Sequence, residues 1–193
     1  MNHSADGIQS PMSRAATLVG SMPADMGEVT NTCPLPGGAS APACLPVKLG
    51  TQAMYGTSVT MDATAGVSLT TDTGMQVMRI REPANGAVTG YVIDRNGTPT
   101  MVLGLELYMD APDMSITLSS HDLHSKKLSV VLEGPLTFLP DGRIAIVLSN
   151  TADLPVEINI DAPLGIAGSV KLIVPKGEMK LQLLSPAQRG VSL

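Results

Sequence analysis

Aromatic side chains are almost missing from this chain of 193 residues, which has no Trp, a single Phe and three Tyr. Proteins that bind single-stranded nucleic acid stack bases on several aromatic rings, and this chain cannot build such a platform. Aromatic residues also supply many of the strongest contacts in tight interfaces, so no interface here can depend on several of them. Sugar binding by ring stacking is disfavoured for the same reason.

Positive charge is scarce as well, because 12 Lys and Arg face 17 Asp and Glu, for a net charge of -5. This balance repels phosphate backbones and anionic membrane surfaces, so we expect no nucleic acid as a partner. No run reaches the roughly 18 apolar residues of a membrane-spanning helix, so we expect no transmembrane segment.

The common motifs of enzymes and cofactor sites are also missing. The sequence contains no G-x-G-x-x-G, no P-loop, no H-E-x-x-H and no G-x-S-x-G. We therefore expect no cofactor and a function that is not enzymatic.

The N-terminal part of the chain is rich in Pro and Gly. Six prolines before residue 47, at positions 11, 23, 34, 36, 42 and 46, argue against a long helix or an inner strand there. We interpret residues 1–50 as an extended arm and residues 51–193 as the folded domain.

Both cysteines, Cys33 and Cys44, lie in this arm with ten residues between them. A disulfide closing so short a loop stabilises by roughly 3 kcal/mol in the chain-entropy model. Such a disulfide predicts an oxidising compartment, periplasmic or extracellular. It also favours a longer chain from which a leader has been removed. Free thiols would instead fit a cytoplasmic or virion protein, and a metal site would need further ligands that the spacing does not supply.

From about residue 57 the apolar residues alternate with polar ones, as in strands buried on one side. The segment LSVVLEG places Leu128, Val130 and Leu132 on one face, and RIAIVLS, VEINID and SVKLIVP repeat the pattern. Asn-Gly at 96–97 and Asp-Gly at 141–142 predict type I′ hairpin turns, and PANGA at 83–87 is a third turn signal. We predict an all-β fold, an antiparallel sandwich, with a half-barrel or barrel as the alternative.

The segment Leu139 to Pro186 contains SNTADLPVEI and VPKGEMKLQL: an Asn-ended strand, a Pro-Val strand start, and a Pro-x-Gly-Glu turn before the last strand. In this it resembles the later strands of bacterial immunoglobulin-like sandwiches. The resemblance covers about a quarter of the chain and implies a non-catalytic interaction module.

One polar segment, SSHDLHSKK at 119–127, brings nucleophile, His and carboxylate types together. His121, Asp122 and His124 are candidate ligands for a transition metal, or members of a hydrolytic site. Neighbouring residues of an extended chain point to opposite faces, which works against a triad, so a polar hairpin loop is the simpler interpretation.

The methionines are the other unusual feature, since the chain has 12 of them. In or beside the predicted strands lie Met61, Met75, Met101, Met109, Met114 and Met179. They either fill an ordinary core or line a cavity that holds a lipid or another apolar ligand.

The sequence thus favours a structural or protein-interaction module that acts outside the cytoplasm. It would bind a protein partner, or itself, by strand addition at a sheet edge, where main-chain hydrogen bonds need no aromatic anchors. A carrier of a lipid or other apolar ligand is the alternative, and a metal-dependent or hydrolytic enzyme is a third possibility.

Overall fold

The computed structural model describes residues 18–19, 22–36, 38–56, 60–64, 68–72, 74–82, 87–113, 120–162 and 166–186. In 18–19, 60–64, 68–72, 160–162, 166–167 and 170–172 the description covers the backbone alone. Within these residues every regular element is a β-strand, and none forms a helix long and apolar enough to cross a membrane. The predicted all-β class is therefore confirmed.

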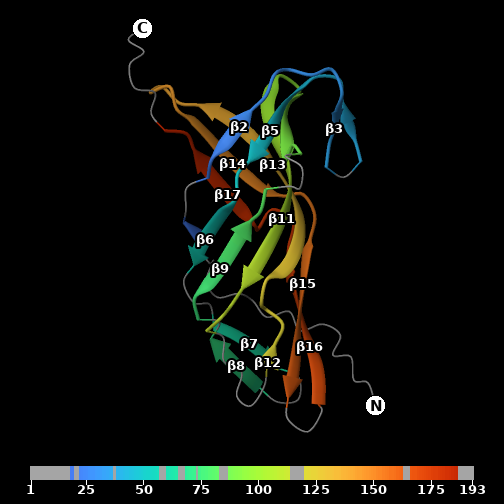
Figure 1. Ribbon diagram of the computed structural model, residues 1–193, viewed down its shortest axis with the longest axis vertical. Coiled ribbons are helices and arrows are strands. Elements are labelled where there is room, and N and C mark those ends of the chain that lie inside the picture. Colours follow the sequence, from blue (N-terminus) through green and yellow to red (C-terminus); the bar gives the residue numbers. More distant parts are fainter. Residues whose placement is uncertain are drawn as a thin grey trace.

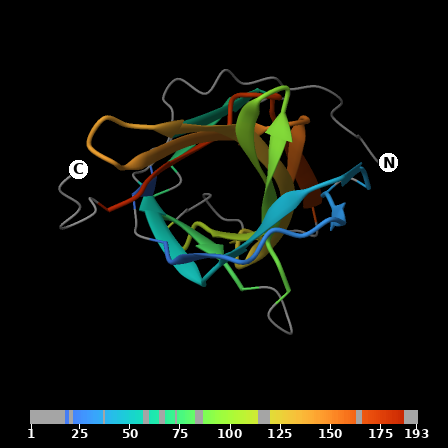
Figure 2. The same cartoon turned by 90° about the horizontal axis from the view of Figure 1, so that it is seen from above.

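The main sheet is antiparallel throughout and curls on itself as a half-barrel, seen end on in Figure 2. Its central strand, β11 (Thr98–Asp110), pairs on one side with β13 (Lys126–Phe138) and on the other with β9 (Gln76–Ile80) and β10 (Gly90–Arg95). The sheet is completed by β1 (Leu18–Val19), β2 (Ala24–Met26), β5 (Cys44–Leu49), β6 (Gln52–Gly56), β14 (Ile144–Asn150) and β17 (Lys180–Leu184). This curl corresponds to the predicted half-barrel alternative.

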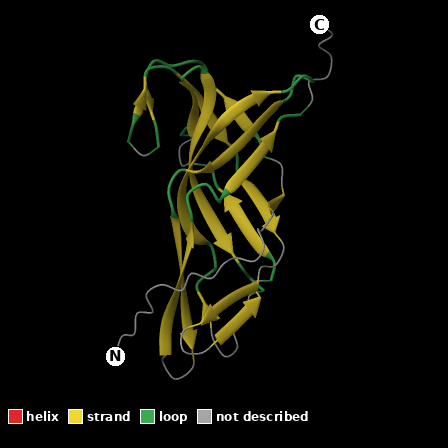
Figure 3. Ribbon diagram, turned by 180° about the vertical axis from the view of Figure 1, so that it is seen from behind, coloured by secondary structure: helices red, strands yellow, loops and turns green. Residues whose placement is uncertain are grey.

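Three smaller sheets accompany the main one (Figure 1). The largest of them joins β12 (Ser120–His121), β15 (Leu154–Ala162) and β16 (Ile166–Val174). The two short hairpins are β3 (Cys33–Pro34) with β4 (Ser40–Ala41), and β7 (Thr60–Thr64) with β8 (Ser68–Asp72). Figure 3 shows the molecule from behind, with the long β15–β16 hairpin reaching past the end of the main sheet. The immunoglobulin-like topology stays a prediction.

The core lies between the concave face of the main sheet and β15. Alternate residues of β11 point into it, namely Met101, Leu103, Leu105 and Leu107, all at most 3% exposed. Leu128, Val130 and Leu132 of β13 meet them, and Leu154, Val156 and Ile158 of β15 cover them from the other side. The predicted period-two pattern is confirmed in β13, because its apolar face is the buried one.

β13 is the strand at which the sheet turns a corner. Its residues 126–135 pair with β11, while residues 132–138 pair with β14. At Gly134 the strands approach so closely that a Cβ atom would lie 1.9 Å from the carbonyl oxygen of Val147. Only glycine can occupy this position without displacing the backbone of β14, so Gly134 allows β13 to serve both parts of the half-barrel.

The two predicted hairpin turns differ in type. Asn96 and Gly97 both have positive φ, 55° and 83°, as a type I′ turn requires. In the second loop Gly142 has φ 80° while Asp141 is not in this region. Gly142 N–H donates to Leu139 O at 3.0 Å, so the loop is a type I turn followed by a left-handed glycine. The type I′ prediction at 141–142 is therefore wrong, and residues 83–86 lie outside the described residues.

Part of the predicted arm belongs to the main sheet. β5, which ends at Leu49, pairs with β10 on one side and with β2 on the other, so strand pairing extends across the predicted domain boundary at residue 50. Pro46 thus lies in an inner strand, contrary to the prediction. It is tolerated there because proline lacks only the N–H donor, and its carbonyl oxygen still accepts a hydrogen bond from Gly27 N–H at 2.9 Å.

Candidate functional site

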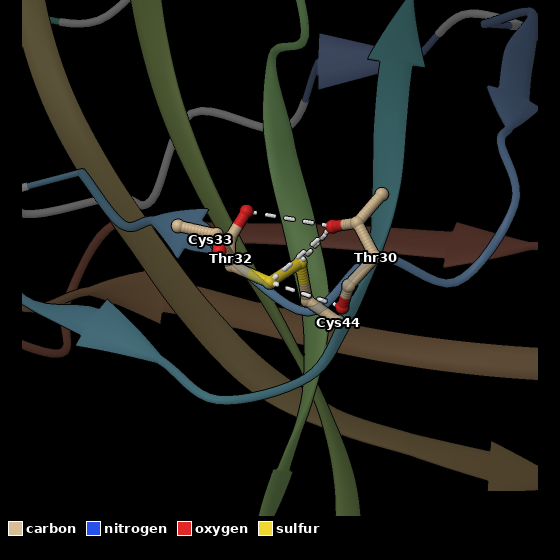
Figure 4. Close-up of a disulfide and its surroundings, with 4 residues drawn as sticks. All are labelled: Thr30, Thr32, Cys33 and Cys44. Atoms are coloured by element: carbon tan, nitrogen blue, oxygen red, sulfur yellow. Dashed lines mark hydrogen bonds between the residues drawn. A yellow bond between two sulfur atoms is a disulfide. The ribbon is translucent and has the colours of Figure 1, made fainter.

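The predicted disulfide between Cys33 and Cys44 is present, with the two Cα atoms 6.1 Å apart. It joins the small β3–β4 hairpin to β5 of the main sheet, and both residues are buried. Thr30 lies beside it, as Figure 4 shows. Its backbone exchanges hydrogen bonds with Cys44 at 2.8 and 3.0 Å, and its hydroxyl lies 3.3 Å from the Cys44 sulfur. The disulfide is therefore an integrated part of the fold.

The disulfide lies in a second apolar cluster on the outer face of the main sheet. Leu35 from the hairpin packs there with Tyr91 and Ile93 of β10 and Val102 of β11. Gly104 adds room for the arm, because a Cβ atom on it would lie 3.1 Å from Pro36. The cystine thus holds the hairpin against a sheet face that would otherwise expose aliphatic side chains to water.

The polar segment after β12 is held by hydrogen bonds, with Asp122 at its centre. The Asp122 carboxylate accepts from the backbone N–H and side-chain amide of Asn159 at 2.9 and 2.7 Å, and from the Lys126 ammonium. Burial disfavours the charged form, but these hydrogen bonds outweigh it, and the pKa of Asp122 lies below its ordinary value. Asp122 therefore anchors the loop to β15.

The two histidines lie next to each other, with ring centroids 4.7 Å apart in a stacked arrangement. His121 Nδ1 accepts a hydrogen bond from Leu123 N–H at 3.1 Å. Within the described residues no three His, Cys, Asp or Glu side chains are grouped so as to hold a metal ion. Of the two serines that precede His121 in this segment, Ser120 is exposed in β12 and Ser119 lies outside the described residues.

A second polar cluster, not foreseen from the sequence, lies at the end of β11. Arg79 of β9 contacts both the Asp110 carboxylate and the Ser125 hydroxyl, the latter at 2.5 Å. Ser125 N–H donates to Asp110 at 2.6 Å, and Ser125 has a positive φ of 57°. Asp110 thus fixes the start of β13, a role that only strand pairing across long sequence distances could reveal.

Asn150 is the most connected buried polar side chain in the described chain. Its exposure is 2%, and its amide donates to the carbonyl oxygens of Ala152 at 2.8 Å and Pro175 at 2.9 Å. Its side-chain oxygen accepts from Met179 N–H at 3.0 Å. These bonds tie together the two motifs SNTADLPVEI and VPKGEMKLQL, so the Asn and the Pro-x-Gly-Glu turn form one structural unit.

The methionines divide between core and surface. Met101, Met109 and Met179 belong to the core or pack against it, whereas Met75 is 45% exposed. The side chain of Met61 and the whole of Met114 lie outside the described residues. Three methionines without a clear sequence signal also belong to the core or pack against it, namely Met22, Met54 and Met78.

No family model matches this chain. No solved structure matches it. Among curated proteins it is similar to alkane uptake protein B of Marinobacter nauticus, with 28% identity over 144 residues. The match covers 62% of this chain and 13% of the relative, so the chain spans a small part of that protein's length.

Proposed function

We propose that this protein is a non-catalytic interaction module that acts outside the cytoplasm and binds another protein chain at the free edge of β16. The buried Cys33–Cys44 disulfide supports a compartment that is oxidising, since disulfides persist there. The nine-residue β16 edge carries the binding part of the proposal.

β16 is the longest of the edge strands that the structure describes. Its pairing partner is β15, and no described strand takes up the main-chain groups on its other side. The remaining edges are short, with three residues in β2 and five in β17. Proteins protect their edges with shortness, Pro and charge. The β16 sequence IAGSVKLIV has no Pro and a single charge over nine residues, so it offers the longest edge with little protection.

Strand addition at this edge suits a chain with few aromatic residues, because main-chain hydrogen bonds provide the affinity. The register places Ile173 opposite Pro155, near the C-terminal end of the edge, and Ile173 is 52% exposed. An incoming strand would cover this apolar side chain and pair with the main-chain groups beside it.

The test is to place a charge on the edge and to compare it with a charge on an inner strand. Ile173→Lys lies on the β16 edge, and Val147→Lys is its matched control, because Val147 is 48% exposed on β14, which is paired on both sides. Self-association is measured by sedimentation velocity, and capture of proteins from the extracytoplasmic extract of the source by affinity pull-down. Ile173→Lys should weaken association while Val147→Lys leaves it intact.

The test includes a second edge variant, Ser169→Lys. If both edge variants associate as strongly as the unaltered protein, the β16 edge is excluded as the binding site. Thermal unfolding of each variant checks that the substitution has not simply unfolded the domain.

A second candidate function is transport or storage of an apolar ligand. Two observations favour it: a core rich in flexible methionines, and the similarity to a protein named for alkane uptake. Organic extraction of the protein purified from its source, followed by mass spectrometry, decides the matter. A stoichiometric alkyl compound supports the carrier, and extracts identical to a blank exclude it.

A further inference from the structure

Three methionines lie side by side on the concave face of the main sheet. Met54 of β6 is directly opposite Met78 of β9, and Met78 is directly opposite Met109 of β11. All three belong to the core cluster or pack against it, which places them on the inner face. We name Met54, Met78 and Met109 the methionine row.

The geometry of the sheet brings the three thioethers within reach of one another. Adjacent strands lie about 4.8 Å apart, and directly opposite Cβ atoms are about 4.5–5.5 Å apart. Side chains on the concave side of a curled sheet converge, and the curl is plain in Figure 2. Because methionine is unbranched and flexible, the sulfurs of Met54 and Met109 can each lean about half a strand spacing towards Met78, which leaves them about one strand spacing apart with room for an ion between them.

Thioether sulfur is a soft, uncharged donor that favours Cu(I) over hard ions such as Ca²⁺ and Mg²⁺. Three thioether sulfurs that converge on one point can surround a monovalent d¹⁰ ion, so that all of its protein ligands are soft. We propose that the methionine row binds one soft monovalent ion, Cu(I), for which Ag(I) is a redox-inert substitute.

The surroundings of the row suit this ion. Its apolar neighbours, Ile80 and Leu107, are each 1% exposed and keep hard oxygen ligands away. Met78 and Met109 are only half-buried, so part of each side chain is open to solvent without any opening of the core. Lys126 lies opposite Met109, but its ammonium is paired with Asp122, so this positive charge beside the row is compensated.

Met101 provides an internal comparison. It is a core methionine of the same strand as Met109, 1% exposed, but its cross-strand neighbours are Val92 and Gly134. It therefore has no directly opposite thioether with which to share an ion. Ion binding at the methionine row requires neither the β16 edge nor a bound apolar ligand.

The test is an Ag(I) nitrate titration of the full chain carrying ¹³C-methyl methionine, followed by NMR in chloride-free buffer. The methyl signals of Met54, Met78 and Met109 should shift together and saturate at one equivalent. Met78→Leu keeps the side-chain volume but removes the central sulfur, and should weaken binding at least about tenfold. Met101→Leu should bind as the unaltered protein does.

The proposal is overturned if the three signals do not respond together, or if Met78→Leu binds Ag(I) as tightly as the unaltered protein. Equal unfolding temperatures of the two leucine variants and the unaltered protein establish that the fold is intact. A repeat with Cu(I) under anaerobic conditions, with a soluble Cu(I) chelator as competitor, gives the affinity for the ion itself.

Discussion

Asn150 and Met179 exchange two hydrogen bonds, one from Met179 N–H to the Asn150 side-chain oxygen at 3.0 Å and one from Asn150 N–H to the Met179 carbonyl at 3.2 Å. Together with the bonds that its amide group donates, these bonds connect Asn150 to three chain segments: the turn after β14, the end of β16 and the turn before β17. A buried polar side chain stabilises a fold only when it is satisfied in this way.

Replacing Asn150 by Leu should destabilise the protein by about 2–4 kcal/mol, because it leaves Met179 N–H and two carbonyl groups without partners in a buried site. Urea unfolding followed by circular dichroism measures the change. Gln182→Leu, on an exposed position of β17, is the control and should change stability by less than about 0.5 kcal/mol. Equal effects of the two substitutions would show that Asn150 does not organise the turns.

Gly134→Ala should impair folding strongly, by about 3 kcal/mol or more, because the new Cβ atom would lie 1.9 Å from a backbone oxygen of β14. Gly168→Ala in β16 is the matched control, since no described atom lies within 4 Å of its Cβ position. We expect it to be neutral or slightly stabilising. Thermal unfolding of both variants measures the difference. If Gly134→Ala is as stable as Gly168→Ala, the close approach of β13 and β14 at Gly134 is contradicted.

Loss of the Cys33–Cys44 disulfide should lower the free energy of unfolding by roughly 3 kcal/mol. Hydrogen exchange should accelerate first in residues 30–44, where Leu35 covers Tyr91 and Val102. The variant Cys33→Ser/Cys44→Ser is compared with reduced and with oxidised unaltered protein. Reductant should lower the stability of the unaltered protein and leave the stability of the double variant unchanged. A stability that does not depend on oxidation would mean that the apolar cluster holds the hairpin unaided.

The lowered pKa of Asp122 predicts a dependence of stability on pH. Because folding favours the ionised carboxylate, its contribution is complete above the pKa of Asp122 in the unfolded chain. It is lost as the pH falls through the lower pKa of the folded protein. Asp122→Asn should therefore be less stable than the unaltered protein at neutral pH, by about 1 kcal/mol or less at this partly exposed site.

The difference between the Asp122→Asn and unaltered proteins should shrink in acid, and thermal unfolding across the acidic range measures it. Asp113→Asn, at an exposed position, is the control. If the difference in stability between the two proteins stays constant with pH, the loop is held by contacts other than those of the carboxylate charge.

The sequence by itself determined the strand class, the buried faces and the disulfide. Period-two alternation places Leu128, Val130 and Leu132 on one face whatever the pairing partner, and Cys33 and Cys44 are close enough along the chain to meet through a short loop. The Asn-Gly turn at 96–97 is similarly local, because both residues readily adopt positive φ.

Tertiary structure decided what depends on contacts between distant segments. Pro46 could enter an inner strand because Gly27, far from it along the chain, supplies a hydrogen-bond partner for its carbonyl oxygen. The Asp-Gly loop at 141–142 adopted another turn type: the five residues between β13 and β14 form a type I turn that is followed by Gly142 in the left-handed region.

The candidate sites divide in the same way. The sequence located His121, Asp122 and His124 on a loop, but only the fold showed that Asp122 is bound by Asn159, 37 residues further along the chain. The methionine row joins residues of three strands through the register of β6, β9 and β11, which no local pattern encodes. Local sequence fixes which face a residue occupies, and strand pairing alone decides which residues share that face.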